Sequence, residues 1–555
     1  MERCDGRDHL SPVSVTAVSA EERSTAGDDS PRRRTPAWLN ALLLGVIFGV
    51  AYSQFPLYFL VQNQYFFYAR VRNGFGFLRS DWLAGTFDPW PVFTQVAYLT
   101  YHYLDQRAFY FYFVVLLGIY AYSMVGIASS LFGIGKTRLR YLSFLALFVA
   151  VHSPLLGWLS EMIVGLDLRT TLIEGVASQR ILWEMFQPGA FGVLLLLSLH
   201  LFLRGRPFLA VVSSSLAVAF NATYVLSAGI LTLAYVLVLV RRGDGIWRSL
   251  AVGACALIVV LPTVTTLSAG VRPTTPAIWA QAQDVLVNLR LSVHALPSTW
   301  FDAAVYVKVA VVLGALYVVR RTELFAIMLL SFAAAVGLTL LQVLSGSNAL
   351  ALLYPWRLSV VLVPLSTVIL IASALSRVLD RGEPRLVRGR GVLVALSSVM
   401  IAVLMVGGAI VTARRFGMNL AREAAAVTRF VGRTKSAGET YLLPLALSGS
   451  QDSLGYSTGR TQWYHFRLSS GAPAFVDWGF IPYKDTEVLQ WYERVRAADA
   501  FYTADRDVRC RMAGALRARY GVTHIILKSN DLAVCGSWRL VERDDNYTLF
   551  TVAPD

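Results

Sequence analysis

The sequence predicts an all-α polytopic membrane protein with about eleven transmembrane helices, followed by a C-terminal α/β domain outside the membrane. Three observations indicate this fold. The 555-residue chain is 55% hydrophobic but only 15% charged, whereas soluble globular chains are about 25% charged. Apolar runs of about 20 residues recur along most of the chain. After Arg414 the charge rises and the apolar runs become shorter.

The charge balance is basic, with a formal net charge of +15. Such an excess would suit a nucleic-acid-binding protein, but much of it lies at the ends of apolar runs. The positive-inside rule accounts for this placement, because Lys and Arg concentrate in cytoplasmic loops. We therefore expect a multi-pass protein of the cell membrane whose partners are membrane lipids, with no nucleic-acid partner.

The N-terminal residues 1–36 are charged, rich in Ser, Pro and Gly, and contain PRRRTP before the first apolar run. This composition predicts a disordered cytoplasmic tail. The next run, 38–60, is longer than the apolar core of a signal peptide and no cleavage pattern follows it. We expect it to be a retained first span.

The apolar runs predict eleven spans, at 38–60, 109–132, 141–160, 184–203, 207–221, 223–240, 249–268, 303–319, 323–343, 352–375 and 391–412. The run 207–240 is counted twice because one helix of that length would measure roughly 51 Å, against a hydrocarbon core of ~30 Å. The two short spans would meet near Asn221. With this count every short basic connection lies on the cytoplasmic side, and the C-terminal region lies outside.

The predicted organisation follows from these spans. The transmembrane domain covers 37–413, with outer loops at 61–108, 161–183 and 269–302, and the extracytoplasmic α/β domain covers 414–555. In the outer domain we expect helices at 418–436, 485–500 and 505–520, and strands at ETYLLPL, PAFVDW, THIILK and TLFTV.

The outer domain holds two of the four cysteines, Cys510 and Cys535. An oxidising compartment would allow a disulfide between them, contributing on the order of 3 kcal/mol in the chain-entropy model. Two separate buried thiols are the alternative. Cys4 in the tail and Cys255 in a span are expected to be inert.

The first outer loop contains two candidate catalytic carboxylates, Asp81 and Asp88, in SDWLAGTFDPWPVF. A carboxylate near the membrane surface can act as a general base for a hydroxyl acceptor, or hold a divalent cation that binds a diphosphate. The alternative is structural: a helix cap before WLAG for Asp81, and a turn or helix start for Asp88.

A second acidic set lies in the loop near 161–183 and includes Glu161, Asp167 and Glu174. These carboxylates could support the chemistry of the first loop. Alternatively, the loop is solvated and its carboxylates pair with Arg169 and Arg180.

Four polar residues near span ends are candidates for binding a lipid phosphate or substrate. Arg290 and His294 are four residues apart, on one face of a helix, where Arg suits bidentate phosphate contact; an interfacial Arg with a structural His is the alternative. Arg357, in LLYPWRLS, opens the tenth span on the outer side, where a lipid phosphate or a carboxylate would satisfy it unless it snorkels. Asn221, in a glycosylation-type NAT pattern close to a span, is expected to break a helix or line a cavity.

No soluble-enzyme motif is present. GIGKTR at 133–138 lacks the first glycine of a P-loop at the required spacing. HExxH, CxxC and GxSxG are absent, and the seven His residues are scattered.

The arrangement of spans and outer loops resembles the GT-C superfamily of polytopic glycosyltransferases. Members use polyprenyl-phosphate sugars, and have a large acidic first outer loop, a second acidic loop after the third span and often a C-terminal extracytoplasmic domain. The phrases SDWLAGTFDPWPVF, FNATYVLSAG, LRLSVHALPSTW, YPWRLSVVLVPLS and RYGVTHIIL resemble an uncharacterised bacterial membrane-protein family with this layout. The chain departs from the superfamily directly after the first span, where Gln62-Asn63-Gln64 stands in place of the usual acidic residue.

The resemblance implies transfer of a sugar from a polyprenyl-phosphate donor to an extracytoplasmic acceptor. Asp81 would be the base or metal ligand, supported by Asp88, Glu161 or Asp167, while Arg290, His294 and Arg357 would hold the lipid phosphate. Two rivals remain: a transporter or flippase of envelope lipids, which predicts internal repeats and charges at span centres, and a non-catalytic scaffold whose outer domain binds an envelope partner.

Overall fold

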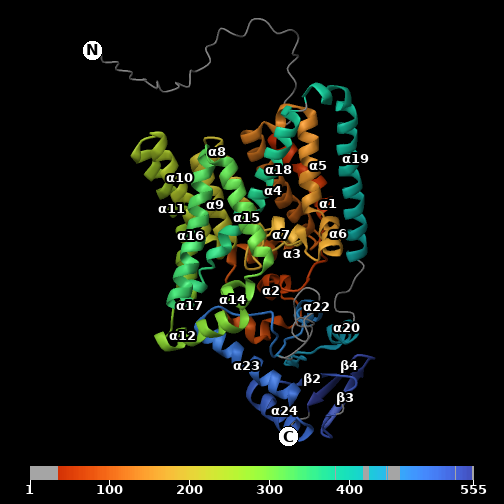
Figure 1. Cartoon of the computed structure of the whole chain (residues 1–555). Helices are drawn as coiled ribbons and strands as arrows, with labels where there is room; N and C mark the ends of the chain where they lie inside the picture. Colours follow the sequence, from red (N-terminus) through yellow and green to blue (C-terminus); the bar gives the residue numbers. More distant parts are fainter. Residues whose placement is uncertain are drawn as a thin grey trace, which may run out of the picture.

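The computed structural model describes residues 36–381, 383–416, 424–445, 447, 463–531 and 533–552. Our predictions for the N-terminal tail, for Cys4 and for the start of the 418–436 helix lie outside these residues. The described residues form a long bundle of helices with a smaller C-terminal domain at one end (Figure 1). We call the end of the bundle that carries this domain the domain face.

The bundle has an apolar helix, or a bent pair of helices, at each of the predicted spans. In the part of the chain that the structure describes, six helices are long and apolar enough to cross a membrane. These spans correspond to α4 (Ala108–Phe132), α10 (Val225–Arg242), α11 (Ile246–Gly270), α16 (Glu323–Ser345), α18 (Ser359–Arg381) and α19 (Glu383–Phe416). This architecture confirms the predicted polytopic all-α membrane fold.

Shorter apolar helices occupy the other predicted positions: α1 (Ala37–Tyr52), α8 (Val193–Leu203), α9 (Pro207–Phe220) and α15 (Ala303–Val319). The span expected at 141–160 is instead bent by 63° between α5 (Arg138–His152) and α6 (Pro154–Val164). Pro154 has no N–H with which to continue α5, and the Ser153 hydroxyl accepts a hydrogen bond from the Leu155 N–H, which starts a new helix.

The apolar run 207–240 is broken where two short spans were expected to meet. α9 ends at Phe220, and α10 follows after Asn221 and a short 3-10 turn. The Asn221 backbone is extended, and its Oδ1 accepts hydrogen bonds from the Thr223 N–H (3.2 Å) and hydroxyl (2.9 Å). A side-chain cap of this kind ends one helix and starts the next.

Basic residues meet at the end of the bundle away from the domain face. Figure 1 shows the turn between α18 and α19 at that end. Arg140 at the start of α5 pairs with Asp380 near the end of α18, so the α4–α5 connection lies there too. A second ion pair joins Arg242 at the end of α10 to Glu323 at the start of α16. The two ion pairs are consistent with the prediction that the basic connections all lie on one side of the membrane.

The domain face is built from short helices of the expected outer loops: α2 (Gln62–Arg72), α3 (Pro91–Tyr103), α7 (Leu168–Ile173), α12 (Pro276–Asp284), α13 (Ser292–Ala295), α14 (Pro297–Trp300) and α17 (Asn348–Ala351). Short 3-10 turns lie at Leu78–Ser80, Trp82–Gly85, Pro188–Gly192, Ala222–Tyr224 and Pro355–Leu358, and a further one, Ile134–Lys136, lies in the α4–α5 connection at the other end of the bundle. One turn of π-helix, Val285–Arg290, joins α12 to α13.

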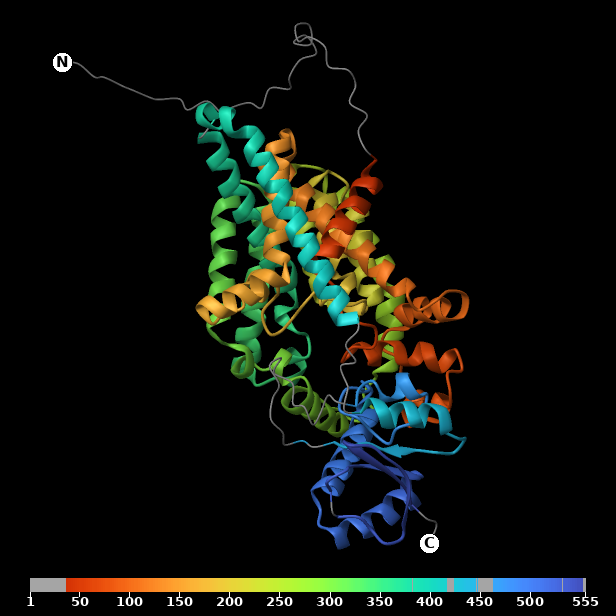
Figure 2. The same ribbon diagram turned by 90° about the vertical axis from the view of Figure 1, so that its right-hand side faces the viewer.

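The C-terminal domain contains α20 (Ala425–Thr434), α22 (Phe466–Ser470), α23 (Asp485–Thr503) and α24 (Arg506–Tyr520). Its sheet has the strand order β1-β2-β4-β3, formed by β1 (Tyr441–Leu442), β2 (His524–Lys528), β3 (Trp538–Arg543) and β4 (Tyr547–Val552). β1 and β2 are parallel and the other pairs are antiparallel. In Figure 2 this sheet and its helices lie beyond the domain face of the bundle.

Two details of this domain differ from the prediction. The segment PAFVDW forms no strand: Ala474 makes only an isolated bridge to Tyr441. The Asp477 side chain is turned inward, where it binds the Gly479 and Phe480 N–H groups and thereby holds a turn. β3 was not predicted, because only its first residue, Trp538, is buried and its apolar pattern is weak.

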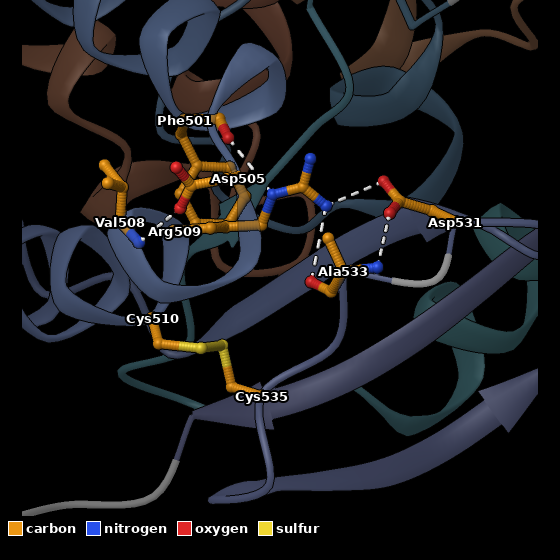
Figure 3. Close-up of a disulfide and its surroundings, with 8 residues drawn as sticks. All are labelled: Phe501, Asp505, Val508, Arg509, Cys510, Asp531, Ala533 and Cys535. Carbon is orange, nitrogen blue, oxygen red and sulfur yellow. Dashed lines mark hydrogen bonds and ion pairs between the residues drawn. A yellow bond between two sulfur atoms is a disulfide. The ribbon is translucent and has the colours of Figure 1, made fainter.

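A disulfide joins Cys510 of α24 to Cys535, and the two Cα atoms are 5.7 Å apart (Figure 3). Beside it, the Arg509 guanidinium donates to the Asp531 carboxylate (2.7 Å) and to the Phe501 carbonyl (3.2 Å). The disulfide and the Asp531 contact tie α24 to the segment that follows β2, and the Phe501 contact ties it to α23. They lie within the C-terminal domain and give it a covalent and an ionic support of its own.

Candidate functional site

A group of basic side chains from three separated segments meets at the domain face. We call Arg180, Arg290, His294 and Arg357 the arginine cluster. His294 Nδ1 lies 2.8 Å from the Ala177 carbonyl oxygen, and the charges of all three arginines act on its ring. The structure therefore brings together the three residues that were predicted to bind a lipid phosphate, and adds Arg180.

Arg357 is only partly satisfied by its neighbours. It lies in the 3-10 turn Pro355–Leu358 that leads into α18, and one guanidinium nitrogen, Nη1, donates to the Gln179 Oε1. The guanidinium lies over the ring of Tyr224, with 4.6 Å between its central carbon and the ring centre. Its buried Nε has no hydrogen-bond partner among the described residues. Neither neighbour carries a charge that could neutralise this cation.

Arg290 is held by the C-terminal domain. Its Nε donates to the Trp478 carbonyl (3.0 Å), and its Nη2 donates to the Gly479 carbonyl (3.2 Å). The residue ends the π-helical turn Val285–Arg290, and such turns are frequent at functional sites. These two carbonyl oxygens occupy two of the five N–H donors of the guanidinium, and they leave its full positive charge.

In the part of the chain that the structure describes, the carboxylate that pairs with the cluster is Glu174, which lies 2.8 Å from the Arg180 Nε. The Arg180 guanidinium also lies over the ring of Trp183. Three guanidinium charges against one carboxylate leave the cluster with an excess of two positive charges. An excess of this kind beside a membrane surface attracts an anion.

His294 is a neutral acceptor inside this positive field. A carbonyl oxygen can only accept, so Nδ1 carries the proton that bonds to Ala177, and Nε2 keeps a free lone pair. Desolvation lowers the pKa of His294 to about 4; the Ala177 bond opposes this shift, and the charges of Arg357, Arg290 and Arg180 reinforce it. At neutral pH the ring is therefore uncharged, and its Nε2 can accept a hydrogen bond.

Three tyrosines from separate segments surround the arginines. Tyr65 belongs to α2, Tyr354 precedes Arg357, and Tyr483 lies in the C-terminal domain. Tyr65 and Tyr354 are electrostatically coupled to both Arg290 and Arg357, and Tyr483 is coupled to Arg290. All three are partly exposed, and no described residue forms a hydrogen bond with any of their hydroxyls. Burial raises the pKa of Tyr65 and Tyr483, so these hydroxyls are protonated donors at neutral pH.

Strained backbone occurs beside the cluster. Tyr354 has φ +49°, and the neighbours Ala177 and Ser178 have φ +57° and +52°. Residues with a Cβ rarely adopt this left-handed region, and each such case costs of order 1–3 kcal/mol. Strain of this kind collects at functional sites, where the surrounding structure enforces it. Here the strained residues are Ala177, whose carbonyl orients His294, and Tyr354, which precedes Arg357.

Asp81 does not join the cluster. It is buried, and its Oδ2 accepts hydrogen bonds from Arg467 Nε (2.6 Å) and the Ala474 N–H (2.9 Å). Its Oδ1 accepts from the Leu83 N–H (3.0 Å), which makes it the cap of the WLAG turn. A carboxylate with both oxygens engaged has little capacity for an acceptor hydroxyl. The geometry favours a structural role for Asp81 over the catalytic role that we expected.

The other three predicted carboxylates also lie apart from the cluster. Asp88 binds Arg72 (3.1 Å) and accepts from the Trp90 N–H (3.0 Å) near the start of α3; desolvation raises its pKa, an effect that these bonds oppose. Asp167 caps α7 by accepting from the Thr170 N–H. Glu161 is exposed on α6. The structure does not bring these carboxylates together.

Their separation bears on the expected divalent cation. Within the described ranges, no group of three or more His, Cys, Asp and Glu side chains has an arrangement that could hold a metal ion. Glu174, a carboxylate at the arginine cluster, is already paired with Arg180. The residues present fit an anion better than a cation.

Lys308 and Tyr483 escaped the sequence analysis, whereas Asn221 was predicted and has an indirect role. Lys308 of α15 is buried and donates to the Gly175 carbonyl (2.7 Å); as the only charge in an apolar span it could have been noticed. Asn221 acts indirectly, because the break that it creates precedes Tyr224, whose ring faces Arg357. Tyr483 carries no local signal, since its place in the site depends on how the C-terminal domain docks.

The comparisons with known proteins are limited. No curated protein matches the chain. A family profile described as "Domain of unknown function (DUF6798)" matches residues 450–498. A solved structure titled "Crystal Structure of ArnT from Cupriavidus metallidurans bound to Undecaprenyl phosphate" is similar with 13% identity and a TM-score of 0.43, covering 93% of this chain and 97% of that chain.

Proposed function

We propose that this protein is a membrane glycosyltransferase whose arginine cluster binds the phosphate of a polyprenyl-phosphate sugar. The carrying observation is the convergence of Arg290 and Arg357, which have no carboxylate partner among the described residues, on the neutral ring of His294. Cations held by neutral oxygens near the membrane surface are costly unless an anion joins them. A phosphate supplies both the charge and the acceptor geometry that guanidinium groups match.

The tyrosines support a ligand with a second, hydroxyl-rich part. Tyr65, Tyr354 and Tyr483 present hydroxyls that no described residue occupies, and they lie within electrostatic range of the arginines. A sugar attached to the phosphate would offer hydroxyls that both donate and accept. The site thus has separate groups for the charged and the neutral parts of a glycosyl phosphate.

The proposed reaction balances as follows. The acceptor hydroxyl oxygen forms a bond to the anomeric carbon, and the bond from that carbon to the phosphate oxygen breaks. The phosphate leaves with the electron pair, and the guanidinium groups stabilise its added charge. The proton of the acceptor hydroxyl passes to His294 Nε2, whose lone pair has no hydrogen-bond partner among the described residues.

We also propose that the domain face is extracytoplasmic. The basic connections joined by the Arg140–Asp380 and Arg242–Glu323 pairs lie at the other end of the bundle, as the positive-inside rule requires of a cytoplasmic side. The Cys510–Cys535 disulfide belongs to the domain face side and suits an oxidising compartment.

The test is binding of undecaprenyl phosphate to the full-length protein in nanodiscs, with undecaprenol as the matched lipid without phosphate. We expect Arg357→Gln to weaken binding of the phosphate by about 10- to 100-fold, because one charge-assisted contact contributes ~1.5–3 kcal/mol. Arg320→Gln, an exposed arginine near the opposite end of α15, is the control and should bind normally. Equal affinity for the two lipids, or normal binding by Arg357→Gln, would refute the proposal.

A further inference from the structure

A buried ion-pair network joins the first outer loop to the C-terminal domain. Arg467 of α22 pairs with Asp81 through Nε (2.6 Å) and with Asp477 through Nη1. Its remaining nitrogen, Nη2, donates to the Ala474 carbonyl (2.9 Å). The three charged side chains are almost fully buried, at 1% exposed for Arg467, 0% for Asp81 and 4% for Asp477. The network therefore has no polar group left over for a ligand.

The Asp477 carboxylate connects this ion-pair network to the backbone that follows it. Its Oδ2 faces Arg467, and its Oδ1 accepts hydrogen bonds from the Gly479 N–H (2.8 Å) and the Phe480 N–H (2.9 Å). One carboxylate thus fixes both the ion pair and the turn at 478–480. The Trp491 indole N–H donates to the Asp477 carbonyl (3.1 Å) and holds the same turn from α23.

The turn at 478–480 is the one that holds Arg290. The Trp478 and Gly479 carbonyls accept both hydrogen bonds that Arg290 makes. A second side chain from the bundle also binds a carbonyl of this segment, because the Gln64 side chain of α2 donates to the Ile481 carbonyl (2.8 Å). The backbone between Asp477 and Ile481 is therefore tied on one side to the ion pair and on the other side to the site.

We infer that Asp81, Arg467 and Asp477 are positioning residues that place Arg290 in the arginine cluster, so that the C-terminal domain completes the site. The inference rests on the proposed function of that cluster. It assigns a role to the domain, which carries Tyr483 and the carbonyls that orient Arg290. It also gives Asp81 a role in the site at a distance, with no contact to substrate.

A second ion pair, whose arginine is buried and whose carboxylate is partly exposed, shows what a purely structural pair in the same domain looks like. Arg509 binds Asp531 and the Phe501 carbonyl, all within the domain and beside the disulfide (Figure 3). None of its contacts reaches the bundle. Asp531→Asn is therefore the matched control for Asp81→Asn, since each change removes one charge from a buried arginine.

The first experiment is hydrogen–deuterium exchange on the full-length protein in nanodiscs, with no ligand. We expect Asp81→Asn and Asp477→Ala to increase exchange of the Gly479 and Phe480 amides, because each loosens the turn. Asp477→Asn should restore part of the protection, since an amide oxygen can still accept from both N–H groups. Asp531→Asn should leave these amides unchanged. Unchanged exchange in Asp81→Asn would overturn the inference whether or not the cluster binds phosphate.

The second experiment measures undecaprenyl phosphate binding in a double-mutant cycle. Arg290→Gln and Asp81→Asn should each weaken binding by about tenfold or more, and the double variant should be no weaker than Arg290→Gln. Asp531→Asn should bind like the wild type. Additive losses would show that Asp81 acts independently of Arg290 and would refute its role in positioning Arg290. Absence of phosphate binding in the wild type would instead refute the proposed function. The exchange experiment would still decide whether Asp81 and Asp477 hold the turn that binds Arg290.

Discussion

Two arginine-centred groups lie near the junction of the bundle and the C-terminal domain, and they differ in how their charge is neutralised. Arg467 has two carboxylate partners, Asp81 and Asp477, and all three side chains are buried. Arg290 and Arg357 bind only neutral oxygens and stay partly exposed. The first group is complete without a ligand. The second keeps its charge and its access, as a binding site for an anion requires.

This contrast changes how buried charge in the chain is interpreted. A carboxylate close to the membrane surface looks catalytic in a sequence, whether it is free or paired. The structure separates the two cases by partner: Asp81 is enclosed by Arg467 and two backbone N–H groups. We propose His294 as the reactive group of the site instead, because its Nε2 has no partner in the described part of the chain.

The largest expected effect is on stability and concerns Arg467. Arg467→Met leaves Asp81 and Asp477 buried without their cation, which should lower the free energy of unfolding by about 3–5 kcal/mol. Thermal unfolding of the detergent-solubilised protein, followed by circular dichroism, measures the loss. A Tm equal to that of the wild type would mean that the pairs do not contribute to the fold, and the contrast between the two groups would fail.

A medium effect is expected in the pH dependence of phosphate binding. The His294 pKa of about 4 in the free protein is set by desolvation and by three arginine charges. A bound phosphate offsets these charges and raises that pKa, so the complex binds more protons than the free protein. Affinity should therefore increase as pH falls from about 7 towards 5, by at most tenfold per pH unit.

The measurement uses a dialkyl phosphate, which keeps a single charge across this pH range, and His294→Asn as the comparison. The variant should bind with little pH dependence over the same interval. A wild-type affinity that stays constant, or falls, with decreasing pH would show that His294 does not respond to the bound anion.

The smallest expected effect is the change in stability caused by Arg357→Met. The side chain has no carboxylate partner to leave behind, so the free energy of unfolding should change by less than about 1 kcal/mol. The same unfolding assay used for Arg467→Met makes the two arginines directly comparable. A loss as large as that of Arg467→Met would assign Arg357 to the architecture and remove it from the binding site.

The spans could be predicted from the sequence because hydropathy is local: each apolar run reports its own environment without reference to other segments. The same reasoning located Arg290, His294 and Arg357, since charged residues beside apolar runs are rare enough to be noticed. It was less successful where a residue is defined by a distant partner. Asp81 binds Arg467, which is 386 positions away in the sequence, and the residues next to either one give no local signal of the pair.

The chain order alone thus settles which segments enter the bundle, where the 207–240 run breaks at Asn221, and which basic residues lie near its ends. Folding in three dimensions settles which charges are neutralised. Docking of the C-terminal domain joins Asp81 to Arg467 and supplies the carbonyls that hold Arg290. It also brings Tyr483 beside Tyr354. These outcomes depend on long-range contacts, which no local pattern of polar and apolar residues encodes.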